Sequence, residues 1–210
     1  MNDMKIIQTL KDEKLCSIIR GVEASSIDNL AKSLIEGGIK CVEVTFNTHG
    51  AKEMIEHLTK YYQNDLLIGA GTVLDSETAK IAIDAGAQFV LSPTLNLEVI
   101  KLCLRYNVVP VPGVLTPTEA LLAWENGARM IKIFPAGVVG SNYIKQIKGP
   151  LPQLHIMAVG AINKDNIKDM LEAGADCVGV GSEIVSKQVV EEKNFDEVRS
   201  RAKELKMLIG

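Results

Sequence analysis

Apolar and polar positions follow two rhythms along the chain. Short, nearly continuous apolar runs are separated by longer stretches in which apolar residues recur every three or four positions. Residues 36–44, 84–92, 125–133 and 172–180 repeat one arrangement: a helix end, a glycine, and a run rich in β-branched and other apolar residues. A glycine just after a helix adopts the left-handed conformation at no steric cost, and a continuous apolar run is typical of a strand buried on both faces. The repeated unit is therefore predicted to be a helix followed by a buried strand.

Four further strand-like runs lie between these copies, at residues 15–20, 66–73, 108–114 and 155–160. Helical periodicity covers residues 25–37, 50–62, 75–86, 96–106, 116–127, 163–174 and 195–208. Ser25, Asp75, Thr116 and Asn163 are expected to cap helices among these. About eight strands alternating with helices predict an α/β fold, a single (β/α)8 TIM barrel that spans residues 1–210 as one domain.

Two other architectures share parts of this pattern. A doubly wound sheet also alternates strands and helices, and it is the structural alternative. A leucine-rich solenoid has a similar period, but its Leu-x-x-Leu-x-Leu signature is absent. Because no helix longer than about ten residues is expected before the first strand, the bottom of the barrel is expected to be lightly covered.

Composition limits the class of protein. The chain has 210 residues, 47% hydrophobic and 23% charged, as in an ordinary globular protein. A formal net charge of -3 offers no polybasic surface, so neither nucleic acid nor a membrane is expected as a partner. The N-terminus lacks the apolar stretch of a signal peptide, and a cytoplasmic protein is expected. The cysteines are widely spaced in apolar surroundings, and we interpret them as reduced core thiols. They are Cys16, Cys41, Cys103 and Cys177.

The repeat also predicts neighbours inside the barrel. Counting five residues on from Gly38, Gly86, Gly127 and Gly174 gives Glu43, Leu91, Lys132 and Gly179. Alternate strands contribute the four side chains of one interior layer, so an acid and an amine from opposite walls are expected to meet there. The next layer toward the carboxyl-terminal mouth, where barrel enzymes hold their active sites, contains Thr45, Pro93, Phe134 and Gly181.

Glu43 and Lys132 have two interpretations. They could form a buried ion pair that specifies the fold, but burying charges costs several kcal/mol and apolar residues of similar volume usually serve as well. Function is the better reason to keep them. Burial disfavours the charged form of a lysine, which frees neutral amine to form a Schiff base, with Glu43 as proton shuttle. The imine itself accepts electrons, so no metal or other cofactor is required.

Small residues follow the last two predicted strands. Position on a barrel favours phosphate binding there, through backbone N–H groups of Gly160, Ala161, Gly181 and Ser182. Arg20 ends the first strand, beside the eighth, where its guanidinium could hold a carboxylate or phosphate; a salt bridge at the rim is the alternative.

Metal chemistry has no support in the histidines. His49, His57 and His155 show no ligand spacing, and we interpret them as ordinary surface or rim residues.

Several motifs together resemble one family over nearly the whole chain. They are Ile18-Ile-Arg-Gly21, Val42-Glu-Val-Thr45, Gly69-Ala-Gly-Thr-Val73, Ser92-Pro93, Pro112-Gly113, Ile131-Lys-Ile-Phe-Pro135 and Gly181-Ser182. The chain resembles the 2-keto-3-deoxy-6-phosphogluconate (KDPG) aldolases. The resemblance implies a trimeric barrel that cleaves a phosphorylated 2-keto-3-deoxy sugar acid to pyruvate and glyceraldehyde 3-phosphate. Many members also cleave 4-hydroxy-2-oxoglutarate to pyruvate and glyoxylate.

The resemblance also implies roles for individual residues. Lys132 forms the imine and Glu43 is the general acid and base, while Thr72 and Pro93 line the pyruvate site and Phe134 covers it. The phosphate site of the family matches Gly160, Ala161, Gly181 and Ser182. Asn47 and Val159 depart from the gluconate enzymes. With Arg20, these two make the chain more similar to the galactonate (KDPGal) relatives, so the preferred epimer stays open.

Two rival functions are distinguishable. An isomerase or synthase of the ribulose-phosphate or thiamin-phosphate kind binds phosphate in a barrel but needs no imine-forming lysine. A non-catalytic sensor of a phosphorylated metabolite is expected to have lost one of the charged pair, and both Glu43 and Lys132 are present.

Overall fold

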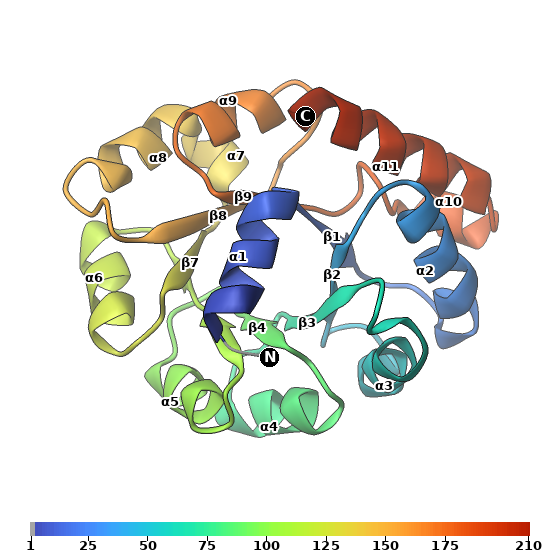
Figure 1. Cartoon of the computed structure of the whole chain (residues 1–210), viewed down its shortest axis with the longest axis horizontal. Helices are drawn as coiled ribbons and strands as arrows, with labels where there is room; N and C mark the ends of the chain where they lie inside the picture. Colours follow the sequence, from blue (N-terminus) through green and yellow to red (C-terminus); the bar gives the residue numbers. More distant parts are fainter. Residues whose placement is uncertain (1–2) are drawn as a thin grey trace.

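The computed structural model describes residues 3–210, in which a ring of strands is surrounded by helices (Figure 1). One sheet contains nine strands of this part of the chain, in the order β5-β4-β3-β2-β1-β9-β8-β7-β6, and all of their pairings are parallel. The strands are β1 (Leu15–Ile19), β2 (Cys41–Thr45), β3 (Leu67–Gly71), β4 (Phe89–Leu91), β5 (Val109–Val111), β6 (Gly113–Val114), β7 (Met130–Ile133), β8 (His155–Val159) and β9 (Cys177–Val180). The predicted barrel is confirmed, and the doubly wound sheet is excluded.

The fifth predicted strand is divided in two, which gives nine strands in place of eight. Pro112 separates β5 from β6 because proline has no N–H to donate to a neighbouring strand. The backbone N–H of Ser92, beyond β4, donates to the carbonyl of Val111 at 3.3 Å, and the N–H of Lys132 on β7 donates to the carbonyl of Pro112 at 2.8 Å. The carbonyl of Val111 thus bonds to the β4 side and the next carbonyl, of Pro112, bonds to β7. This pair of hydrogen bonds closes the barrel between β5 and β7.

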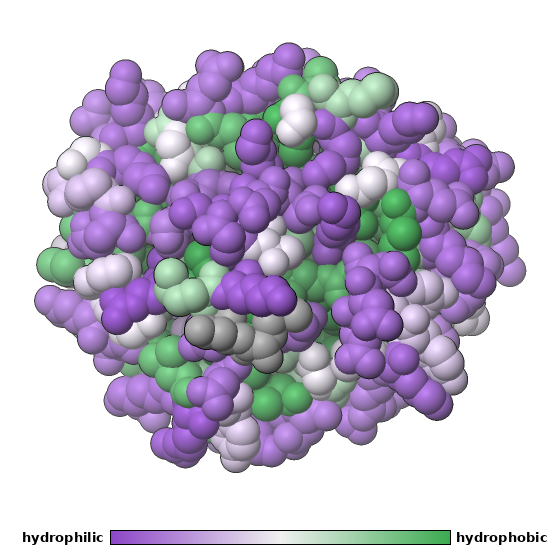
Figure 2. Space-filling view, in the orientation of Figure 1, coloured by the Kyte–Doolittle hydropathy of each residue, from purple (hydrophilic) through white to green (hydrophobic). Residues whose placement is uncertain are grey.

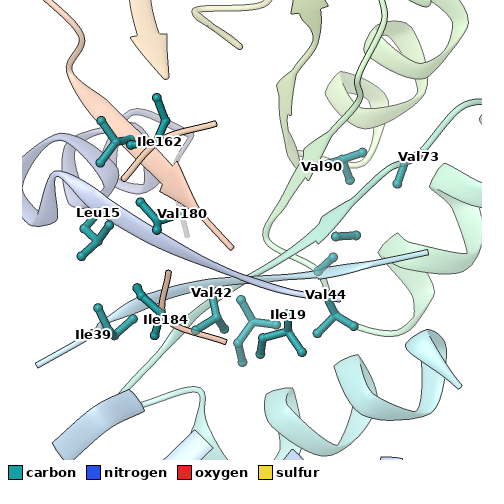
Figure 3. Packing of buried hydrophobic residues seen from close by; sticks show 14 of the residues in the cluster. Leu15, Ile19, Ile39, Val42, Val44, Val73, Val90, Ile162, Val180 and Ile184 are labelled. Atoms are coloured by element: carbon teal, nitrogen blue, oxygen red, sulfur yellow. The ribbon is translucent and has the colours of Figure 1, made fainter. Parts of the chain in front are cut away.

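Helices surround the strands. They are α1 (Asp3–Glu13), η1 (Ala24–Ser26), α2 (Ile27–Glu36), α3 (Ala51–Tyr62), α4 (Ser76–Asp84), α5 (Leu97–Arg105), α6 (Pro117–Glu125), α7 (Ala136–Val139), α8 (Ser141–Lys148), α9 (Ile167–Glu172), α10 (Lys187–Glu191) and α11 (Phe195–Ile209). Most of them pack against the outer face of the strands, whereas α1 covers one end of the barrel. Ile19, Val42 and Val44 lie in this outer layer (Figure 3). Because successive side chains of a strand alternate between faces, a second cluster, which includes Cys16 and Phe89, fills the inside of the barrel.

The bottom of the barrel is covered, contrary to the sequence-based expectation. Helix α1 lies across the end at which the strands begin (Figure 1). Ile6, Ile7 and Leu10 on one face of this amphipathic helix are buried in the interior cluster. Eleven residues suffice because a helix of three turns places these side chains on one stripe.

Two of the four predicted helix N-caps, Asp75 and Thr116, are confirmed. Asp75 accepts a hydrogen bond from a backbone N–H of α4 at 2.7 Å, and Thr116 forms a capping box at α6. Ser25 does not cap a helix, because the chain first makes the short 3-10 turn η1. Asn163 does not cap α9, because the residue at the N-cap position is Asn166. The Asn163 side chain instead accepts from the N–H of Asp165 at 3.0 Å, in the turn that precedes the helix.

The cysteines are free and buried, as predicted. Burial raises the pKa of Cys41 and of Cys103 to about 12, so these thiols are unreactive. The face of the molecule that carries α1 is mostly polar, with apolar residues in small groups (Figure 2). Within residues 3–210, no helix is both long and apolar enough to cross a bilayer.

Candidate active site

The acid and the amine predicted from the repeat both lie inside the barrel. Glu43 is in the middle of β2 and Lys132 is in β7, and only 2% and 3% of their surfaces are exposed. Alternation along each strand directs them inward, since Val42 and Val44 on β2 belong to the outer layer. They do not form the buried ion pair that was the alternative interpretation, since no Glu43–Lys132 contact occurs among the ion pairs of the described residues. Glu43 Oε2 is buried without a hydrogen-bond partner among these residues.

Burial favours the neutral form of both groups. It lowers the pKa of Lys132, the negative charge of Glu43 opposes this shift, and the positive charge of Arg20 adds to it. Burial likewise raises the pKa of Glu43, and Lys132 and Arg20 oppose that shift. The Lys132 ammonium lies 5.0 Å from the centre of the Phe134 ring, two residues further along the chain. Burial thus shifts both groups toward their neutral forms, in which an amine is a nucleophile and a carboxylic acid can donate a proton.

Gly71 makes room for the Glu43 carboxyl group. A Cβ atom built at Gly71, at the end of β3, would lie only 2.1 Å from Glu43 Oε2. Any larger residue would displace the carboxyl group, so this glycine is required by close approach rather than by backbone conformation. Gly71 belongs to the Gly69–Val73 motif, in which the sequence analysis assigned a role only to Thr72.

A cavity of about 290 Å³ opens beside this interior, at the carboxyl ends of β1, β8 and β9. It is lined by all five residues predicted to bind phosphate, which are Arg20, Gly160, Ala161, Gly181 and Ser182, and by Phe134, which was predicted to cover the pyruvate site. Val159 and Lys187 also contribute to its wall. Phe134 joins the two parts of the site, because its ring lines the cavity and also faces the Lys132 ammonium.

The small-residue loop after β8 is held in a fixed shape. Gly160 and Ala161 both have positive φ, of 94° and 54°. The carbonyl of Gly160 accepts from the N–H of Gly137 at 2.8 Å, and the carbonyl of Ala161 accepts from the Asn166 side chain at 2.8 Å. A Cβ atom at Gly137 would lie 2.2 Å from the Ala161 carbonyl oxygen. Helix α7 therefore packs directly against this loop and supports it.

Thr72 and Pro93 do not line the cavity, but they lie at the neighbouring strand ends. Thr72 follows β3 and has a φ of 56°, a conformation that costs a residue with a side chain about 1 kcal/mol or more. The Ser92 hydroxyl donates to the carbonyl of Val73 at 2.6 Å, and the N–H of Val73 donates to the carbonyl of Leu91 at 3.1 Å. These bonds hold the loop that carries Thr72 against the end of β4.

A buried pair of threonines connects the loops after β1 and β2. Thr45 Oγ1 and Thr48 Oγ1 are 3.0 Å apart, and the N–H of Gly21 donates to Thr48 Oγ1 at 2.9 Å. Gly21 directly follows Arg20, so these hydroxyl groups fix the backbone from which the arginine extends. Asn47 lies on the same loop as Thr48, outside the 290 Å³ cavity.

The histidines lie outside this site. His57 faces Asp28 at 3.4 Å and His155 faces Asp176 at 3.2 Å, both near the surface. No group of three metal-ligating side chains occurs within residues 3–210.

With this geometry established, similarity to known proteins identifies the family. The family model described as KDPG and KHG aldolase matches residues 6–201. The 2-dehydro-3-deoxy-phosphogluconate aldolase of Haemophilus influenzae is 36% identical over 202 residues, which are 96% of this chain and 95% of that protein.

The chain belongs to the KDPG and KHG aldolase family.

This aldolase has relatives on both substrate branches. The 2-dehydro-3-deoxy-6-phosphogalactonate aldolase of Escherichia coli is 33% identical over 171 residues, 81% of this chain and 83% of that protein. The KDPG aldolase of Legionella pneumophila, whose crystal structure holds pyruvate as a covalent carbinolamine intermediate, superimposes with a TM-score of 0.89. It is 28% identical, over 97% of this chain and 98% of that one. Aldolases are carbon–carbon lyases, so membership of this family favours an aldolase over the imine-free isomerase or synthase and over the non-catalytic sensor.

Sequence reasoning missed several supports of the aldolase site. Gly71 acts through close approach, and Ser92 and Thr48 act through hydrogen bonds of their hydroxyl groups; neither kind of contact leaves a periodic signal in the sequence. Lys187 lies five residues beyond Ser182, and only the fold of the intervening loop brings it to the cavity. The family motifs were the one signal in the sequence that could have pointed to Gly71 and Ser92.

Proposed function

We propose that this aldolase cleaves 2-dehydro-3-deoxy-6-phosphogluconate to pyruvate and D-glyceraldehyde 3-phosphate through a Schiff base on Lys132. We propose the same chemistry for 4-hydroxy-2-oxoglutarate, which gives pyruvate and glyoxylate. The supporting observation is the buried, unpaired Glu43 and Lys132, whose neutral forms are favoured, beside a cavity that carries Arg20 and small-residue loops. The family membership of the chain and its relatives on the gluconate branch agree with this substrate class.

The first half of the reaction forms the imine. The neutral Lys132 amine attacks the C2 carbonyl of the keto acid, and one proton of the nitrogen moves to the carbonyl oxygen to give a neutral carbinolamine. Glu43, in its protonated form, donates the proton with which the C2 hydroxyl leaves as water. The C2–N double bond that results is a cationic iminium, stabilised by the Glu43 carboxylate that has just formed.

The second half breaks the C3–C4 bond. A base removes the proton of the C4 hydroxyl, the C4 carbonyl forms, and the electron pair of the C3–C4 bond moves toward the iminium to give an enamine. We assign this proton transfer to Glu43, which then returns the proton to C3. Water adds to C2 of the iminium, and its hydrolysis releases pyruvate and restores the Lys132 amine. No electron acceptor other than the imine is needed, so we propose no cofactor.

The remaining predicted residues hold the two ends of the substrate. We assign the pyruvate carboxylate and C3 to the region bordered by Thr72, Pro93 and Phe134. We assign the phosphate to Arg20 and to the backbone N–H groups of the small-residue loops, namely those of Gly160, Ala161, Gly181 and Ser182. Backbone N–H groups and a guanidinium are donors that match phosphate oxygens.

The galactonate epimer is the second candidate substrate. Val159 lines the cavity, where it offers methyl groups in place of a hydroxyl donor, and Asn47 adds no charge to the neighbouring loop. Both features, with a galactonate relative at 33% identity, favour testing the C4 epimers side by side. A hydrogen bond to one substrate hydroxyl is enough to decide between such epimers.

Reductive trapping tests the proposal. The protein is incubated with pyruvate and sodium borohydride, its intact mass is measured, and the adduct is located by peptide digestion. We expect one pyruvate adduct, on Lys132, and none in a Lys132→Met variant. A folded protein with no adduct, or with the adduct on another lysine, would contradict the proposed chemistry.

The substrate is then tested by pyruvate release. Both phosphorylated epimers and 4-hydroxy-2-oxoglutarate are supplied at saturating concentration, with Lys132→Met as the matched blank. Cleavage of the gluconate epimer at the higher kcat/KM supports the proposed substrate. A preference for the galactonate epimer would move the assignment to the second candidate, and no release from either phosphorylated compound would reject both.

We also propose a cytoplasmic homotrimer built from one barrel domain per chain. Reduced, buried thiols suit a reducing compartment, and all strands of residues 3–210 join one sheet. Leu74, Leu115 and Val138 are exposed apolar residues that follow β3, β6 and β7, and contact with other copies would bury them. Light scattering of the purified protein should give three times the chain mass of 22.8 kDa.

A further inference from the structure

The geometry points to Lys187 as a second cation for the substrate phosphate, acting together with Arg20. This inference rests on the proposed function, and it adds a substrate-binding residue that none of the family motifs contains. It concerns affinity for the phosphorylated end of the substrate only. The imine chemistry at Lys132 is independent of it.

The composition of the cavity wall supports the assignment. Arg20 and Lys187 are its only charged residues within the described part of the chain, and both are positive. The rest of the wall is apolar or consists of small residues: Ile18, Phe134, Val159, Gly160, Ala161, Ile162, Gly179, Gly181, Ser182 and Val185. A cavity that carries two cations and no carboxylate has a positive potential, which favours a dianion over a neutral ligand.

The Lys187 side chain is free to bind an anion. Its one ion-pair partner in residues 3–210 is Glu191, at 3.5 Å, and the two side chains are 84% and 65% exposed. Exposed pairs four residues apart on a helix contribute little, so the ammonium leaves this partner at small cost. Arg20 makes no ion pair within residues 3–210.

The backbone that carries Lys187 is held in place by hydrogen bonds, although the side chain is exposed. The N–H groups of Ile184 and Val185 both donate to the carbonyl of Gly181 at 2.9 Å, which folds the loop after β9 into a tight turn. Ser186 Oγ then accepts from the N–H of Val189 at 3.3 Å and so starts α10. A flexible cation on a fixed base can follow a phosphate group at the mouth of the cavity without moving the loop.

The two cations differ in what they recognise. The planar guanidinium of Arg20 can bond two phosphate oxygens at once, whereas the ammonium of Lys187 acts as a point charge. A phosphate monoester carries close to two negative charges above its second pKa of about 6. A second cation therefore suits a phosphorylated sugar acid, whereas 4-hydroxy-2-oxoglutarate has no phosphate and its C5 carboxylate lies closer to the imine carbon.

Steady-state kinetics of Lys187→Gln, Lys187→Arg and Lys168→Gln test the inference. Lys168 is an exposed lysine at the other end of the barrel, beside α1 and α11, so its substitution removes the same charge far from the site. For Lys187→Gln we expect KM for the phosphorylated substrate to rise about fivefold with kcat nearly unchanged. For 4-hydroxy-2-oxoglutarate we expect no change. Lys187→Arg should restore the phosphorylated KM, and Lys168→Gln should match the unaltered protein.

Titration with inorganic phosphate gives a readout that does not require turnover. Phosphate should bind Lys187→Gln several-fold more weakly than Lys168→Gln at low salt, and the difference should shrink at high salt because the ammonium is exposed. Equal phosphate affinity and equal KM in these two variants would overturn the role of Lys187. Failure of the proposed function is distinguishable, because it would appear as absent Lys132 trapping in the unaltered protein.

Discussion

Two carboxyl groups of the barrel, the partly buried Asp176 and the fully buried Glu43, differ sharply in their surroundings. Asp176, before β9 at the bottom of the barrel, accepts from the N–H of Ile156 at 2.9 Å and from Lys148 at 3.1 Å, and faces His155 at 3.2 Å. Glu43, toward the mouth, has one oxygen with no partner in residues 3–210. The first carboxyl group is fully paired, and the second is not.

The pKa shifts follow from these surroundings. Burial alone would raise the pKa of Asp176, but the Ile156 N–H and Lys148 outweigh burial and lower it. At Glu43 burial dominates, and the pKa is raised although Lys132 and Arg20 oppose the shift. A paired carboxylate stabilises the fold, whereas an unpaired one costs stability and keeps its proton available. The comparison indicates that Asp176 stabilises the fold and that Glu43 is available for proton transfer.

Replacing Glu43 should give the largest effect of the variants that separate these two roles. Glu43→Gln keeps the size of the side chain but cannot shuttle a proton, so kcat should fall about 100- to 10,000-fold. Retro-aldol turnover measured by pyruvate release checks this value. The pyruvate adduct on Lys132 should still form under borohydride, but more slowly.

The control for this variant is its fold. Circular dichroism and the midpoint of urea unfolding should show no loss of stability at neutral pH, because the removed group is unfavourably buried. A kcat within about threefold of the unaltered protein would show that another group moves the protons.

Asp176→Asn should lower the stability of the protein and leave its activity unchanged, the opposite of Glu43→Gln. Loss of the negative charge leaves Lys148 without its ion-pair partner and weakens the acceptor for the Ile156 N–H, so the free energy of unfolding at neutral pH should fall by about 2 kcal/mol, with kcat preserved below the unfolding transition. The folded pKa lies below the ordinary value of 3.8. The stabilisation is therefore complete above pH 3.8 and is lost as the pH falls through the lowered pKa. Urea unfolding at several pH values measures this dependence, and a variant of unchanged stability at pH 7 would refute the structural role.

Features of the fold that depend on local sequence could be predicted. The repeated glycine and apolar run placed β2, β4, β7 and β9 correctly, because capping and two-sided burial act on local sequence. Counting along the repeat then placed Glu43 and Lys132 inside the barrel. Helix α1 was not predicted, because its apolar face is short and is explained only by the barrel end that it covers.

Features that depend on how a loop folds could not be predicted from the sequence. Ser25 and Asn163 are good capping residues, but each is drawn into a turn that precedes the helix. The absence of an ion pair between Glu43 and Lys132 depends on the width of the barrel, which residue counting does not give. The partners of Asp176 come from the ends of α8 and β8, and nothing in the repeat marks them.

Replacing Lys132 should have a small effect on stability, with a sign opposite to that of Asp176→Asn. Burial lowers the pKa of Lys132 below its ordinary value of 10.5, so the unfolded chain binds this proton more tightly than the folded protein does. The cost to stability is complete below the folded pKa and disappears as the pH rises toward 10.5. Lys132→Met should therefore be more stable than the unaltered protein by about 1 to 2 kcal/mol at pH 7, and the gain should vanish near the ordinary value. Urea unfolding of both proteins at neutral and alkaline pH measures the difference. A loss of stability at pH 7 would mean that Lys132 is paired as Asp176 is, and that the contrast between a structural and a chemical site is wrong.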